Sequence, residues 1–110
     1  MTRDKINQIV AALVEAINAS TRPPALYPIA RLKYPPRGVF VDELPDGSMV
    51  VRLAKYGYEY KHRGPKPKTP PAVNVAEIFG IFSNTLTSVD VTVTAVVDDG
   101  TQISIYVKEE

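Results

Sequence analysis

The prolines of this chain lie in two stretches, and their positions limit where regular structure can form. Of the ten prolines, all but Pro45 fall within residues 23–36 or 65–71. Because proline fixes φ and lacks an amide hydrogen, both stretches are expected to be extended and outside helices and central strands. The chain is therefore expected to contain, in order, a helix at about 3–19, a proline-rich arm at about 22–37, a hairpin at about 38–60, a proline-rich connector at about 64–72, a helix at about 74–84 and a hairpin at about 89–108.

Two of these segments have helical periodicity. Thr2 can cap the first helix, whose apolar residues recur with i, i+3, i+4, i+7 spacing. Asn74 can cap the second, and Glu77 can return the bond in a capping box. Gly80 lies inside this second helix and weakens it, so we expect that another backbone approaches closely there or that the helix ends early.

The segment 38–60 contains two β-rich runs around a Pro-Asp-Gly turn. A three-residue loop of residues 45–47 pairs Val41 with Val51 and Val39 with Leu53. A two-residue loop would mix apolar and charged residues on each face. The sequence therefore favours the three-residue loop.

The same reasoning applied to segment 89–108 places Asp98, Asp99 and Gly100 in a three-residue loop. The predicted pairs on the apolar face are Ala95–Ile103, Val93–Ile105 and Val91–Val107. The residues expected to face outward are Thr92, Thr94, Ser104 and Tyr106. Asp98 and Asp99 are thus interpreted as ordinary turn residues.

An amphipathic helix and a one-sided sheet must both bury their apolar faces. We therefore predict an α+β fold in which two helices pack on one face of a four-stranded antiparallel sheet, in the order helix, hairpin, helix, hairpin. Residues 1–110 are expected to form a single domain. The two halves resemble either a weak internal duplication or repeated use of a favourable hairpin turn, and both interpretations stay open.

The residue inventory excludes several classes of chemistry. The chain has no cysteine, so it has no disulfide, thiolate metal site or cysteine nucleophile. Neither a G-x-S-x-G nor a G-x-x-x-x-G-K motif is present. The longest apolar stretch, residues 6–17, is too short and too polar to span a bilayer. No cofactor, metal or membrane partner is expected, and the expected location is cytoplasmic or virion-associated.

The charges are segregated along the sequence although they nearly cancel in total. Between residues 22 and 68, ten basic residues outnumber four acidic ones, whereas residues 69–110 carry six acidic residues and one basic residue. The formal net charge is only +1. A chain with this distribution can attract polyanions or copies of itself.

The densest candidate contact site is a run of alternating tyrosines flanked by basic residues. Its members are Lys55, Tyr56, Tyr58, Tyr60, Lys61, Arg63, Lys66 and Lys68. Aromatic rings stack on bases and basic side chains hold phosphates, so the run suits single-stranded nucleic acid. The run is more typical of a strand whose tyrosines pack on a neighbour. The only histidine, His62, lies between Lys61 and Arg63, and because these cations oppose its protonation no catalytic role is expected for it.

These observations favour a non-enzymatic protein–protein assembly module, expected to be a subunit of a homo-oligomer or larger complex. In this hypothesis the basic middle of one chain meets the acidic region of a neighbour. The alternative is single-stranded nucleic-acid binding through the tyrosine run. In layout alone, a short N-terminal helix, an extended arm and a small sheet with helices is similar to small phage neck or tail-completion proteins.

Overall fold

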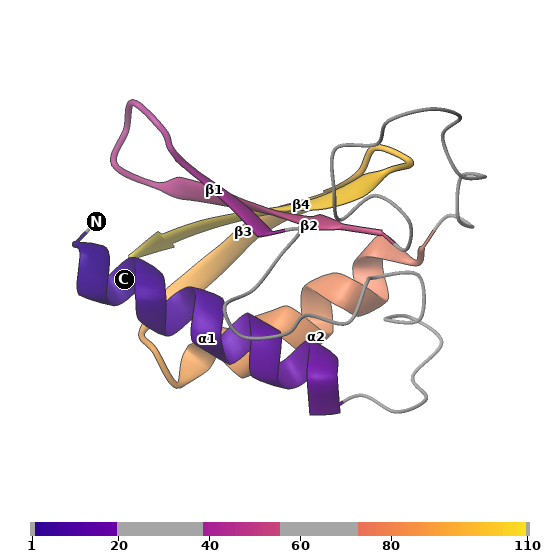
Figure 1. Ribbon diagram of the computed structural model, residues 1–110, viewed down its shortest axis with the longest axis horizontal. Coiled ribbons are helices and arrows are strands. Elements are labelled where there is room, and N and C mark those ends of the chain that lie inside the picture. The colour runs from indigo at the N-terminus through magenta and orange to yellow at the C-terminus, as the bar shows by residue number, and fades with distance from the viewer. Residues whose placement is uncertain (1, 20–38, 56–72, 110) are drawn as a thin grey trace, which may run out of the picture.

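The computed structural model describes residues 2–19, 39–55 and 73–109, which form an α+β fold of helices and a single sheet (Figure 1). The elements are α1 (Arg3–Ala19), β1 (Val39–Glu43), β2 (Met49–Ala54), α2 (Val75–Thr87), β3 (Val91–Asp98) and β4 (Gln102–Glu109). This order confirms the predicted helix-hairpin-helix-hairpin arrangement. The predicted proline-rich arm and connector, and the extension of the first hairpin to residue 60, lie outside the described residues.

The sheet is antiparallel with the strand order β1-β2-β4-β3, and both helices lie on one side of it (Figure 1). The core fills the space between the two layers. Its fully buried members include Ile9, Leu13, Met49, Val51, Leu53, Ile78, Phe82, Leu86, Ile103, Ile105 and Val107. We call the sheet surface that faces away from the helices the outer face.

Both helices begin at the predicted caps. Thr2 Oγ1 accepts a hydrogen bond from Lys5 N at 3.2 Å, and Asn74 Oδ1 accepts one from Glu77 N at 3.2 Å. Helix α2 runs to Thr87 rather than to about residue 84. Both expectations at Gly80 are wrong, because a Cβ placed there meets no atom within 4 Å and the helix continues past it. Burial of Ile78, Phe82 and Leu86 offsets the cost of the glycine.

The first hairpin has the predicted register. Val41 pairs with Val51 and Val39 pairs with Leu53. The loop of residues 45–47 closes with a bond from Leu44 N to Ser48 O at 2.8 Å, and Gly47 takes the left-handed conformation with φ 88°. Glycine adopts this conformation without the steric cost that a Cβ imposes.

The second hairpin has a different register from the predicted one. Asp99 N donates to Gln102 O at 3.1 Å, so Gly100 and Thr101 form a two-residue loop, and Gly100 has φ 97°. The observed pairs next to the loop are Asp98–Ile103, Val97–Ser104, Val96–Ile105 and Ala95–Tyr106. A β-bulge at Thr94 then shifts the register, so that Val93 pairs with Val107. Glycine at the first position of a two-residue turn is a favoured hairpin connection, which explains why this loop is the shorter one.

The bulge changes which side chains of β3 reach the outer face. Ala95 and Val97 now share that face with Tyr106 and Ser104, their partners on β4. Val97 is 48% exposed, whereas Ser104, predicted to be exposed, is only 7% exposed. Asp98 is turned toward the helix side of the sheet. The outer face is therefore more apolar than predicted, and it includes Phe40, which is 51% exposed.

Candidate functional site

Lys55 is the one predicted contact residue that lies within the described part of the chain. It follows the last residue of β2, and its side chain is fully buried. The structure thus places this side chain in the interior of the protein. The other predicted contact residues lie outside the described residues: Tyr56, Tyr58, Tyr60, Lys61, Arg63, Lys66 and Lys68.

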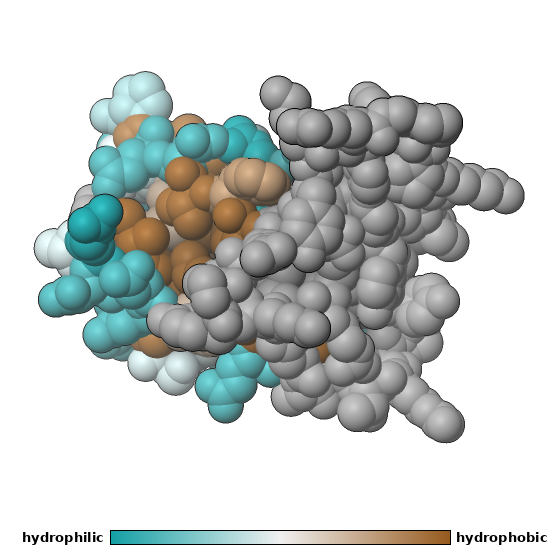
Figure 2. All heavy atoms as spheres, viewed as in Figure 1, coloured by the Kyte–Doolittle hydropathy of each residue, from teal (hydrophilic) through white to brown (hydrophobic). Residues whose placement is uncertain are grey.

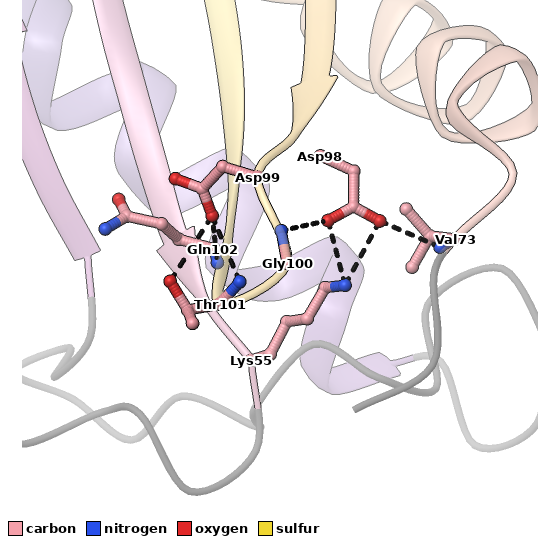
Figure 3. A network of polar contacts seen from close by, with 7 residues as sticks. All are labelled: Lys55, Val73, Asp98, Asp99, Gly100, Thr101 and Gln102. Atoms are coloured by element: carbon pink, nitrogen blue, oxygen red, sulfur yellow. Dashed lines mark hydrogen bonds and ion pairs between the residues drawn. The ribbon is translucent and has the colours of Figure 1, made fainter. Parts of the chain in front are cut away.

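The buried Lys55 forms an ion pair with Asp98 at the end of β3 (Figure 3). Its Nζ lies 2.9 Å from Asp98 Oδ1 and 3.1 Å from Oδ2. The backbone of Lys55 is also fixed, since its N–H donates to Thr101 O at 2.9 Å. Because only 12% of the Asp98 side chain is exposed, this pair is largely removed from solvent.

Asp98 also binds two backbone amides, which Figure 3 shows converging on its carboxylate. Val73 N donates to Oδ2 at 3.0 Å, and Gly100 N donates to Oδ1 at 2.8 Å. Together with the contacts from Lys55 Nζ, these bonds occupy the acceptor positions of an ionised carboxylate. Asp98 is thus arranged as an anchor rather than as a free base. We call Lys55, Val73, Asp98 and Gly100 the Asp98 clamp.

The surroundings of Asp98 hold its carboxyl group in the charged form. Burial opposes ionisation, but the hydrogen bonds from Lys55, Val73 and Gly100, with the positive charge of Lys55, outweigh it. The net result is that the pKa of Asp98 lies below its ordinary value. Asp98 is therefore ionised at neutral pH, and Lys55 is its ion-pair partner.

The clamp connects three parts of the chain that are distant in sequence. It joins the end of β2, the residue next to the cap of α2, and the turn between β3 and β4. Lys55 and Val73 are also the residues that flank segment 56–72, which carries the remaining predicted contact residues. One carboxylate therefore fixes the two points at which this segment leaves and rejoins the described structure.

Two described acidic residues of the C-terminal third, Asp98 and Asp99, bind other groups of the chain through their carboxylates. Asp99 Oδ1 accepts hydrogen bonds from Thr101 N at 3.0 Å and Gln102 N at 2.8 Å, which stabilises the turn. Asp90 occupies the left-handed region, with φ 56°, between α2 and β3. The carboxylates of Asp98 and Asp99 are thus hydrogen-bonded within the chain. Neutralising them would disturb the fold before it tested assembly.

The described basic residues of the middle segment are paired in the same way. Arg52 forms an ion pair with Asp42 on the neighbouring strand, and Lys55 pairs with Asp98. Of the two pairs, only Lys55–Asp98 joins the basic middle segment to the acidic last third, because Asp42 itself belongs to the middle segment. At Lys55 and Asp98, therefore, the segregation of charge in the sequence does not give a polarised surface.

The apolar character of the outer face was not predicted from the sequence. Phe40 on β1 and Val97 on β3 are both more exposed than the other large apolar side chains of the described residues. Both lie on one row across the sheet, formed by the pairs Phe40–Arg52, Arg52–Ser104 and Ser104–Val97. Alternation in β1 could have identified Phe40, whereas the bulge that exposes Val97 leaves no clear signal in the sequence.

Among residues 2–19, 39–55 and 73–109, no group of three His, Asp or Glu side chains is placed to hold a metal ion. No helix in these ranges has the length and apolarity needed to cross a membrane.

Comparison with known proteins identifies no relative: no protein-family model, no curated protein and no solved structure matches the chain. Its function must therefore be argued from its own residues.

Proposed function

We propose that this chain is a non-enzymatic protein–protein assembly module that forms a homo-oligomer through the outer face of its sheet near β1. The observation that carries the proposal is the exposure of Phe40, at 51%, on a small sheet that also exposes Val97 at 48%. Burying a side chain of this size contributes about 1.5–3 kcal/mol. Phe40 and Val97 lie on opposite edge strands of the sheet, so the apolar side chain that is exposed on β1 is Phe40.

The proposal differs in one respect from the hypothesis based on sequence alone. That hypothesis relied on attraction between a basic and an acidic region. The ion pairs of Arg52 and Lys55 within the chain remove two of those basic residues from consideration. We therefore attribute association to the burial of apolar side chains. Charged residues at the margin of the interface would orient the two chains.

Light scattering during size-exclusion chromatography tests this proposal. We expect a mass that is a multiple of 12.1 kDa for the unmodified chain. Phe40→Ser should shift the mass toward the monomer, because it removes apolar area from the interface. Phe79→Ser is the matched control, since Phe79 is also exposed, at 37%, but lies on α2 on the other side of the sheet. A mass of 12.1 kDa for the unmodified chain at every concentration would refute the homo-oligomer.

A second candidate function is single-stranded nucleic-acid binding through Tyr56, Tyr58 and Tyr60. The observation that favours it is the Asp98 clamp, which anchors both ends of the segment that carries these tyrosines. Lys55 no longer belongs to this candidate site. Titration with a labelled single-stranded oligonucleotide at low salt tests the idea, and the absence of binding under those conditions would end it.

A further inference from the structure

Strand β1 forms one edge of the sheet, and half of its backbone hydrogen-bonding groups point away from β2. Leu44 N bonds to Ser48 O, and hydrogen-bonded pairs alternate along an antiparallel ladder. The pairs Asp42–Val50 and Phe40–Arg52 are therefore the hydrogen-bonded ones. The N–H and C=O groups of Val39, Val41 and Glu43 consequently point outward, where they meet no partner within the described part of the chain.

The two edges of the sheet differ in how well they are protected. Strand β3, at the other edge, is interrupted by the bulge at Thr94, and Thr92 already has an interaction partner. Bulges, prolines and lysines are common means of preventing association at sheet edges. Strand β1, with the sequence Val-Phe-Val-Asp-Glu, has no bulge, proline or lysine, and its two charged residues lie together at its C-terminal end. Of the two edges, β1 is thus the one suited to pairing.

An apolar surface borders this open edge. Figure 2 shows a continuous brown area at the junction of β1 and α1, in the same view as Figure 1. The half-buried apolar residues of these two elements at the margin of the core include Ile6, Val10, Val39 and Val41. A chain added at β1 would therefore gain apolar contacts as well as backbone hydrogen bonds.

We propose that two copies of this chain pair antiparallel through β1, about a two-fold axis at Val41, to form one continuous sheet. The inference rests on the self-association proposed above and names its interface. The outward groups of Val41 would exchange hydrogen bonds with those of Val41 in the partner copy, and Val39 would pair with the partner's Glu43. An isologous contact of this kind is the commonest form of homodimer.

Side-chain placement selects this register over its neighbours. On the outer face, Phe40 lies opposite the partner's Asp42 and diagonal to the partner's Phe40, within reach of an aromatic side chain. Each Asp42 keeps its own Arg52 as counter-charge. A register centred on Asp42 would place two like charges directly opposite each other, which is unfavourable. A register centred on Phe40 would pair three residues of the described strand, 39–41, whereas the register centred on Val41 pairs all five.

Val41→Pro tests the pairing without removing a bond of the folded chain. The N–H of Val41 points away from β2, and proline is tolerated where the edge N–H faces solvent. We expect Val41→Pro to keep the circular dichroism spectrum of the unmodified chain. The dimer dissociation constant should rise about tenfold or more, because neither copy can then donate its residue 41 N–H to the other. Val41→Thr is the matched control, since it keeps the N–H and the branched shape, and it should keep the dimer mass.

Cysteine cross-linking provides a second measurement that does not depend on how the proline variant folds. The chain has no cysteine of its own, so an introduced thiol is unique. Under mild oxidation, Val41→Cys should form a covalent dimer on a non-reducing gel. A mixture of Val39→Cys and Glu43→Cys chains should cross-link with each other in the proposed register. Val97→Cys, on the opposite edge strand, is the control and should stay monomeric on the gel.

The outcomes separate the interface from the function that it serves. An oligomer whose mass is unchanged by Val41→Pro and whose Val41→Cys variant does not cross-link would refute pairing through β1 and leave assembly standing. An unmodified chain that is monomeric at every concentration would refute both. A dimer that Val41→Pro dissociates and Val41→Cys traps would support both.

Discussion

A single carboxylate, that of Asp98, determines the geometry at one end of this sheet. Its bonds to Lys55, Val73 and Gly100 compensate for the burial of two charged groups. Removing one member of a buried ion pair lowers the free energy of unfolding by more than the intact pair contributes to it, because the other charge remains buried without a partner. The clamp is therefore the residue-scale feature most sensitive to substitution.

We predict that Asp98→Asn lowers the free energy of unfolding by about 3 kcal/mol or more at neutral pH. Asparagine still accepts a hydrogen bond from a backbone amide, but it no longer compensates the buried ammonium group of Lys55. Urea denaturation followed by circular dichroism measures the change. Asp46→Asn is the control, because Asp46 is exposed and its carboxylate bonds only locally to Ser48, so its effect should be much smaller.

The pH dependence of unfolding tests whether the charge of Asp98 causes the loss of stability in Asp98→Asn. The folded-state pKa of Asp98 is lowered, so its stabilising contribution is present above the unfolded-state pKa of about 3.9 and is lost as the pH falls through the folded-state value. The difference between the unmodified chain and Asp98→Asn should therefore shrink as the pH falls below about 4. A difference that stays constant down to the acid transition would show that the charge of Asp98 is not its cause.

At the scale of single elements, α2 contains a glycine that nothing in its surroundings requires. Gly80 is exposed, has an ordinary helical conformation and has no neighbour within 4 Å of a placed Cβ. Gly47 is the opposite case, since its φ of 88° is one that other residues adopt with difficulty. The same substitution should thus have opposite effects at the two positions.

We predict that Gly80→Ala raises the free energy of unfolding by about 0.5–1 kcal/mol, because alanine has a smaller entropy cost in a helix. Gly47→Ala should lower it by about 1 kcal/mol or more, because alanine is strained at positive φ. Parallel thermal and urea unfolding of both variants measures the two effects. Destabilisation by Gly80→Ala would mean that a close contact at this helix surface had been overlooked.

The elements were largely predictable from sequence because their signals are local. The Thr2 cap and the apolar spacing after it define α1, and the first hairpin has only one register that separates apolar from charged residues. In β3, Val96 and Val97 are both apolar, so alternation does not determine which of them faces the core. The bulge at Thr94 decides this, and no residue pattern marks it.

The clamp was not predictable for a related reason. Lys55 and Asp98 are 43 residues apart, and their contact depends on the register of the second hairpin. With the predicted three-residue loop, Asp98 belongs to the turn and Lys55 to the surface. The corrected register places Asp98 on the helix side of the sheet, next to the end of β2. The site could therefore be identified only after the pairing of β3 and β4 was known.

At the scale of the whole molecule, the sheet has one regular edge and one bulged edge. A small domain with an apolar surface next to a regular edge gains stability when that edge is covered. In the proposed dimer, folding and association are coupled, so stability depends on the concentration of the chain. Stability that rises with chain concentration therefore indicates an interface that stabilises the fold.

We predict that the thermal unfolding midpoint of the unmodified chain rises with protein concentration, measured from about 5 to 500 µM, because dilution favours the dissociated state. Val41→Pro should show a midpoint that is independent of concentration over the same range. Differential scanning calorimetry at several concentrations measures both. Equal, flat profiles for the two proteins would contradict coupling between the β1 edge and stability.

The bulge at Thr94 also determines where growth of the assembly stops. Once two copies have joined at β1, each free end of the combined sheet is a β3 strand whose bulge interrupts a regular ladder. A third copy could not pair regularly with a bulged β3 edge, so strand addition should stop at two chains instead of continuing into a fibril. The irregular strand would thus protect a protein with an exposed sheet edge from open-ended polymerisation.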